Sequence, residues 1–150
     1  MSPYKHTQPG TYARVTFGAL VLLCLAAALY VGANDSRAIW VFGGMAALMF
    51  IGLLLFHSLT VEVARGYLRF RFGVGLIHRQ FRLKEIVSAE KVRNRWFYGW
   101  GIKLTPHGWL FSVSGFDAIQ IKLKNGRQYR IGTDDPERLL AAVQQAMERS

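Results

Sequence analysis

The sequence has a single cysteine, Cys24, among its 150 residues. One cysteine excludes a disulfide framework or a cysteine-based metal site within one chain. Cys24 lies in an apolar run, where a thiol behaves as a small apolar side chain. The four histidines, His6, His57, His78 and His107, do not have the spacing of metal ligands. We therefore expect no metal and no cofactor.

Catalytic patterns are missing as well. No Ser-His-Asp or Cys-His arrangement is recognisable in the chain. The carboxylates offer no pair suited to general acid–base work, because Glu62 faces a predicted cross-strand arginine and Asp134, Asp135 and Glu137 suit a helix start. Residues 73–75 read Gly-Val-Gly between two predicted strands, without the strand-to-helix context of a phosphate loop. We expect a chain that is not an enzyme and has no catalytic residues.

Charge is absent from two runs of 19 residues, 15–33 and 38–56. Neither run has the polar face of a soluble amphipathic helix, and at ~1.5 Å per residue each nearly crosses a ~30 Å hydrocarbon core. We predict transmembrane spans at about 14–33 and 38–57, so that residues 1–57 form an N-terminal tail and a helical hairpin. A cleaved signal peptide is the alternative for the first run, but that run is long and a second span follows at once.

The predicted hairpin turns at Asn34–Arg37, which forces the two spans to run antiparallel. Small residues at four-residue spacing predict close helix packing; they are Ala28, Gly32, Gly43 and Ala47. Lysine and arginine flank the outer ends of the spans, so the positive-inside rule predicts a multi-pass protein of the cytoplasmic (inner) membrane with both termini cytoplasmic. Between their flanks the spans hold no Asp, Glu, Lys or Arg, which argues against a transporter or ion path.

Residues 58–150 predict a cytoplasmic β domain with a C-terminal helix, which makes the chain an α+β membrane protein. Apolar residues alternate on both sides of Arg65-Gly66, and a two-residue turn pairs Val63 with Leu68, Val61 with Phe70 and Leu59 with Phe72. The same turn sets Glu62 opposite Arg69. Strands are also expected at 76–83 and 86–92.

The aromatic stretch 95–115 predicts another hairpin, with Trp100, Ile102 and Leu104 facing Val113, Phe111 and Trp109. We expect Trp100 and Trp109 to be buried in the core. Around Asn125-Gly126, matching the apolar faces requires a three-residue loop with Gly126 left-handed, pairing Ile121 with Tyr129 and Ile119 with Ile131. A helix then begins at Asp134 or Asp135 with Pro136 in its first turn.

The succession of seven or eight antiparallel strands and a C-terminal helix after two spans resembles the small bacterial membrane proteins with a pleckstrin-homology (PH)-like domain. The residues that carry the resemblance are Gly99–Ile102, Thr105–Trp109, Ser114-Gly115 and Ile131–Pro136. It implies a PH-like sandwich or partly open barrel over 58–150. It implies little about activity, since such domains bind lipids, peptides or each other.

A basic surface is the one functional signal, since the chain carries 19 lysines and arginines against 9 acidic residues. Juxtamembrane arginines can simply hold topology and rest on anionic lipid, or they can form a specific pocket for an acidic headgroup or phosphorylated ligand. Lys122, Lys124 and Arg130 are expected on an outward face. The candidate binding residues are Arg69, Arg71, Arg79, Arg82, Arg93, Arg95 and Trp96.

The sequence therefore predicts a membrane-anchored, non-enzymatic binding or scaffold module that engages acidic lipid headgroups or an unknown membrane or cytoplasmic protein. The alternative is an accessory or assembly subunit of a larger membrane complex, through self-association into a homo-oligomer. An enzyme acting on lipids at the membrane interface is a weaker alternative. No nucleic-acid-binding module is present, so nucleic acid is not an expected partner.

Overall fold

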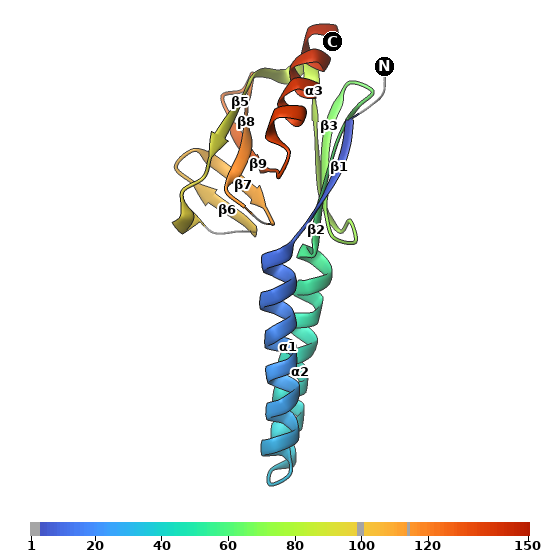
Figure 1. The fold of residues 1–150 in the computed structure, drawn as a ribbon, viewed down its shortest axis with the longest axis vertical. Coiled ribbons are helices and arrows are strands. Elements are labelled where there is room, and N and C mark those ends of the chain that lie inside the picture. The colour runs from blue at the N-terminus through green and yellow to red at the C-terminus, as the bar shows by residue number, and fades with distance from the viewer. Residues whose placement is uncertain (1–3, 99–100, 114) are drawn as a thin grey trace.

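The computed structural model describes residues 4–98, 101–113 and 115–150. Two long helices, α1 (Thr11–Gly32) and α2 (Ser36–Phe56), form a hairpin that projects from a β domain (Figure 1). Both helices are long and apolar enough to cross a membrane. The Asp35 side chain caps α2 by accepting a hydrogen bond from the Arg37 backbone N–H at 3.0 Å. We call the end of the domain nearest the hairpin helix-proximal and the opposite end helix-distal.

The two helices meet through small side chains, as expected, but not through all the predicted ones. Ala28 is buried between them, and a Cβ on Gly32 would lie 2.4 Å from the Ile39 side chain. The prediction for Gly43 and Ala47 is wrong: Gly43 has open space around its Cα and Ala47 is exposed. The prediction failed because α2 turns a different side toward α1. The buried residues of α2 are Ala38 and Ala46, which lie about two turns apart on that side.

The first sheet contains four strands in the order β1-β2-β3-β4. They are β1 (Tyr4–Pro9), β2 (Ser58–Ala64), β3 (Tyr67–Phe72) and β4 (Ile77–Arg82). The predicted β2–β3 register is confirmed, including Val61 opposite Phe70 and Glu62 opposite Arg69. Strand β1 was not predicted, because its residues are mostly polar and only Gln8 is buried. It pairs with β2 along its whole length, so the N-terminal tail belongs to the sheet.

The second sheet has the order β5-β8-β9-β7-β6. Its strands are β5 (Ile86–Arg93), β6 (Gly101–Thr105), β7 (Gly108–Ser112), β8 (Asp117–Leu123) and β9 (Gln128–Gly132). The described residues thus form nine strands: eight of them, β2 to β9, lie in 58–150, where seven or eight were expected, and β1 is the additional strand. The β7–β9 pair is parallel, so the expectation of purely antiparallel strands is wrong there. The predicted β8–β9 register and the left-handed Gly126, at φ 86°, are confirmed.

The two sheets pack face to face, and α3 (Pro136–Arg149) closes the core between them at the helix-distal end (Figure 1). Asp135 is its N-cap residue and Pro136 lies in the first turn, as predicted. Leu139 and Val143 of α3 reach the core. The α+β class is therefore confirmed, with two apolar helices, two sheets and a C-terminal helix.

The β6–β7 hairpin corrects the prediction about the aromatic stretch. Its register is confirmed, since Ile102 lies opposite Phe111 and Leu104 opposite Trp109. Phe111 is buried, but Leu104 is 70% exposed and Trp109 is 42% exposed. The expected burial of Trp109 is therefore wrong, and Trp100 lies outside the described residues. The hairpin forms the edge of its sheet, and its tip extends beyond the core.

Candidate membrane-facing surface

In the first sheet, the position of a residue along its strand gives its distance from the helical hairpin. β2 begins at Ser58, directly after α2, and rises away from the helices (Figure 1). At ~3.3 Å per residue, the row of Thr60, Arg71 and His78 lies about 7 Å above Ser58. By the same rise, Arg69 lies about 13 Å and Arg82 about 20 Å above it. The candidate arginines of this sheet therefore occupy different heights.

Arg69 and Arg71 share the outward face of the first sheet, as predicted. A groove of about 400 Å³ crosses this face and has one carboxylate, Glu62, among its described lining residues. Its basic lining residues are Lys5, Arg69, Arg71, His78 and Arg79. The Arg69 guanidinium also lies 5.1 Å from the centroid of the Tyr67 ring.

Arg79 has a different position from the other arginines of this sheet. It lies opposite Phe70 in the strand register, on the core side of β4. Its guanidinium is 5.6 Å from the ring centroid of Tyr129 and 5.8 Å from that of Phe111. Both rings belong to the second sheet, so Arg79 covers the open edge between the sheets through cation–π contacts.

The remaining candidates gather at the helix-proximal end of the second sheet. β5 descends toward the hairpin and ends at Arg93, and the short 3-10 helix η2 (Trp96–Tyr98) follows at about the level of the helix ends (Figure 1). We call residues 93–98 the aromatic turn. Trp96 is 77% exposed and Phe97 is 56% exposed, with their ring centroids 5.8 Å apart. The Arg95 guanidinium lies 5.8 Å from the Phe97 ring centroid.

A buried polar network holds the aromatic turn against the second sheet. Asn94 is buried; its backbone N–H donates to the Phe116 carbonyl oxygen at 2.7 Å, and its side-chain Oδ1 accepts from Arg130 Nη1 at 3.1 Å. Arg130 Nε also donates to Gln120 Oε1 at 2.9 Å. Arg130 lies on the face of β9 away from the core, as predicted, but it is covered rather than solvent-exposed, because only 7% of it is accessible. Burial lowers the pKa of Arg130, although an arginine remains charged at neutral pH.

A second helix-proximal turn, residues 73–76 between β3 and β4, lies on the other side of the hairpin (Figure 1). The Gly73 N–H donates to the Ser58 carbonyl oxygen at 2.8 Å, and the Val74 N–H donates to that of Leu54 at 3.3 Å. A Cβ on Gly73 would lie 2.1 Å from the Leu54 carbonyl oxygen, so only glycine fits. The side chains of Val74 and Leu76 are exposed. The domain thus exposes apolar side chains on both sides of the hairpin.

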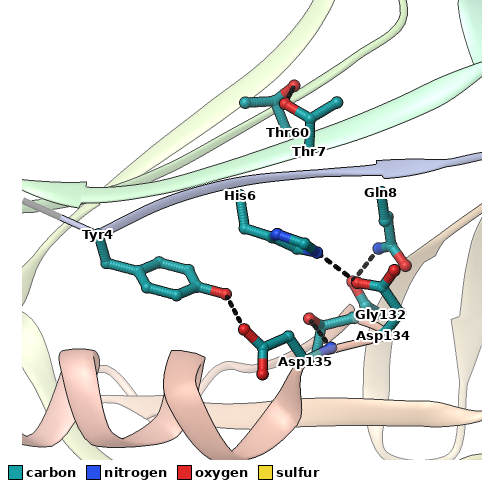
Figure 2. A network of polar contacts seen from close by, with 9 residues as sticks. Tyr4, His6, Thr7, Gln8, Thr60, Gly132, Asp134 and Asp135 are labelled. Atoms are coloured by element: carbon teal, nitrogen blue, oxygen red, sulfur yellow. Dashed lines mark hydrogen bonds and ion pairs between the residues drawn. The ribbon is translucent and has the colours of Figure 1, made fainter.

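Strand β1 ties the two sheets together near the start of α3 (Figure 2). Gln8 Nε2 donates to the Gly132 carbonyl oxygen at 2.7 Å, and His6 Nε2 lies 2.6 Å from Asp134 Oδ1. Tyr4 Oη donates to Asp135 Oδ2 at 3.4 Å. Burial, with a further contribution from Asp135, raises the pKa of Tyr4 to about 12. These contacts connect the tail before α1 to both sheets, so the domain is joined to the hairpin through β1 as well as through β2.

Sequence reasoning missed the residues that hold this surface in place. Asn94 was not singled out from the sequence, and Arg130 was expected only as one of several basic residues on an outward face, because neither residue belongs to an apolar pattern. Among the described residues, no group of three or more His, Cys, Asp or Glu side chains could hold a metal ion. Comparison with known proteins finds no family model that matches the sequence and no curated protein that is significantly similar to it.

Proposed function

We propose that this chain is a two-span protein of the cytoplasmic membrane whose PH-like domain lies against the anionic leaflet as a non-enzymatic binding module. Both termini are cytoplasmic in this proposal. The positive-inside distribution of lysine and arginine supports the orientation. The PH-like assignment is supported by two packed sheets closed by a C-terminal helix, and the parallel β7–β9 pair is a departure from the expected pattern.

The aromatic turn is the observation that carries this proposal. It lies at about the level of the helix ends (Figure 1). Trp96 and Phe97 of this turn are exposed and are close in sequence to Arg93 and Arg95. Tryptophan is favoured at membrane–water interfaces, where its ring is partly apolar and partly hydrogen-bonded. A basic residue near an anionic leaflet contributes ~1 kcal/mol of attraction. The exposed Val74 and Leu76 on the other side of the hairpin add a second apolar contact.

The candidate residues fall into two groups according to their height above the ends of the helices. The headgroup layer of one leaflet is about 5–8 Å thick, so it includes the level of the aromatic turn and approaches that of Arg71. Arg82 lies about 20 Å above Ser58, beyond the ~8 Å Debye length at physiological ionic strength. Lipid contact therefore falls to Arg71, Arg93, Arg95 and Trp96, whereas Arg82 faces the aqueous phase.

Tryptophan quenching in the full chain tests this function. The full chain is required because β1, which precedes α1, is part of the first sheet. In anionic bilayers with brominated acyl chains, Trp40 of α2 is quenched in every variant, and we expect Trp96→Phe to remove a clear further part of the lipid-dependent quenching. Trp109→Phe is the matched control, because Trp109 is also exposed but lies on the β6–β7 hairpin.

Two outcomes would contradict the proposal. One is equal quenching in the wild-type chain and in Trp96→Phe. The other is equal contact of the aromatic turn with neutral and anionic bilayers, which would contradict an electrostatic contribution of the arginines to membrane contact. Gentle detergent extraction followed by mass measurement distinguishes this function from that of an assembly subunit. A stable larger complex would favour the assembly subunit.

A further inference from the structure

The largest cleft described in this molecule lies at the helix-distal end of the domain, away from the lipid-facing surface. It has a volume of about 880 Å³ and lies between α3, the β2–β3 turn and the start of β1. Small or aliphatic side chains from both walls line it, namely Val63, Leu83, Ala142 and Ala146. Three arginines, Arg65, Arg69 and Arg149, and one glutamate, Glu62, also line it. The cleft therefore combines apolar surface with an excess of positive charge.

The backbone of Arg65 indicates that its side chain matters. Arg65 and Gly66 form a two-residue hairpin turn with φ of 52° and 80°. Such turns favour asparagine or glycine, because a left-handed conformation is unfavourable for other side chains. Arg65 is the only non-glycine residue with positive φ among the described residues. The turn requires this conformation, and it holds Arg65 at a position where the residue lines the cleft.

The position of the cleft excludes bilayer lipid as its ligand. Arg65 is seven residues beyond Ser58, which at ~3.3 Å per residue places it about 23 Å above the end of α2. Figure 1 shows the β2–β3 turn and the end of α3 at the end of the domain farthest from the hairpin. This height exceeds both the headgroup layer and the ~8 Å Debye length. The ligand must therefore come from the aqueous side.

The residues that line the cleft favour a ligand with separated carboxylates over one with a compact phosphate. The C-terminal turns of α3 line the cleft, and the negative end of a helix dipole opposes a dense anion nearby. The Glu62 carboxylate also repels a dense anion. Arginine forms two parallel hydrogen bonds with a carboxylate, and the apolar lining suits an aliphatic side chain between acidic ones. We propose that this cleft binds an acidic peptide segment of a cytoplasmic protein, with Arg65 and Arg69 pairing with its carboxylates.

Fluorescence anisotropy with the full chain in neutral nanodiscs tests the proposal, because neutral lipid removes competition from the leaflet. The probe is a fluorescein-labelled octapeptide of alternating Glu and Leu, and the matched peptide has Gln in place of Glu. We expect saturable, salt-sensitive binding of the Glu peptide only. Arg65→Asn and Arg69→Gln should each weaken it about tenfold, the loss of one charge-assisted contact. Arg127→Gln, which removes the same charge on the β8–β9 turn, should leave binding unchanged.

Arg65→Asn also separates a binding role from a structural one. Asparagine adopts the left-handed conformation more readily, so we expect the unfolding midpoint to rise by about 2–4 °C while binding falls. The proposal would be overturned by unchanged peptide binding in both arginine variants, or by a fall in the midpoint of Arg65→Asn that accompanies the loss of binding. Failure of the Glu peptide to bind would overturn it too. Pyrophosphate that binds as tightly as the peptide would instead assign the cleft to small phosphorylated anions. All these outcomes are independent of the lipid contact proposed for the aromatic turn.

Discussion

Strand β3 connects two turns of opposite character. At its helix-proximal end, Gly73 lies against the backbone carbonyls of Leu54 and Leu55, where a side chain has no room. At its helix-distal end, Gly66 has open space around it, and its neighbour Arg65 carries a full side chain in a left-handed conformation. The proximal turn is thus fixed by packing against the hairpin, whereas the distal turn leaves its side chain free to face a cleft.

The arginines at the two ends of the domain differ in the same way. The proximal ones lie beside aromatic rings: Arg95 is near Phe97, and Arg93 is 5.9 Å from the Phe116 ring centroid. The distal ones line a cleft with small apolar side chains. The first arrangement suits a membrane interface and the second suits a peptide, although both sets of arginines look alike in the sequence.

The largest expected effect comes from breaking the proximal turn. We expect Gly73→Ala to lower the free energy of unfolding by about 3 kcal/mol, because it combines a left-handed alanine with a clash against the Leu54 carbonyl. Gly66→Ala is the matched control, with the same backbone requirement but open space, and should cost about 1 kcal/mol. Denaturant titration of the full chain in detergent, followed by tryptophan fluorescence, measures both. Equal losses would show that the two turns do not differ.

A smaller effect is expected when the aromatic turn loses its buried support. Arg130→Met leaves Asn94 Oδ1 and Gln120 Oε1 without their arginine partner, at a cost of about 2 kcal/mol. Hydrogen exchange of residues 94–98 should accelerate, while that of the β2–β3 turn should stay the same. Lys122→Met is the control, because Lys122 is an exposed cation on the neighbouring strand β8. Unchanged exchange at residues 94–98 would mean that Arg130 does not hold this turn.

The smallest expected effect is a pH dependence of stability that arises from Tyr4, which joins β1 to α3. Its pKa is raised from 10 to about 12 in the folded chain. The unfolded chain therefore loses this proton first as the pH rises. The associated stability is present below pH 10 and is lost as the pH rises through about 12. Between these values, the unfolding midpoint of the wild-type chain should fall more steeply than that of Tyr4→Phe. Parallel curves would contradict this account of β1.

Periodicity was enough to predict most of the fold. The registers of β2–β3, β6–β7 and β8–β9 followed from matching apolar faces, and α3 from its Asp-Asp-Pro start and apolar stripe. Strand β1 was not predicted because its contacts are backbone pairs and the hydrogen bonds of four polar side chains. The burial of Trp109 was predicted wrongly because alternation tells which residues share a face, but not how far the opposite sheet extends over that face.

The candidate site was less predictable than the fold. The sequence located the arginines and Trp96, but their heights above the helices depend on strand direction and register. Arg130 became a buried support because the aromatic turn folds over the outer face of the second sheet, a long-range contact without a local pattern. The distal cleft combines residues from β1, the β2–β3 turn and α3, which lie far apart in the sequence.

In the proposed function, one end of the domain touches the membrane and the other does not. Nitroxide labels on Phe97→Cys and Lys84→Cys, each in a Cys24→Ala chain reconstituted into anionic bilayers, test it directly through their collisions with oxygen and with a water-soluble relaxant. We expect the label at position 97 to collide preferentially with oxygen, which concentrates in lipid, and the label at position 84 to collide preferentially with the water-soluble relaxant. Preferential collision of both labels with the water-soluble relaxant would contradict it.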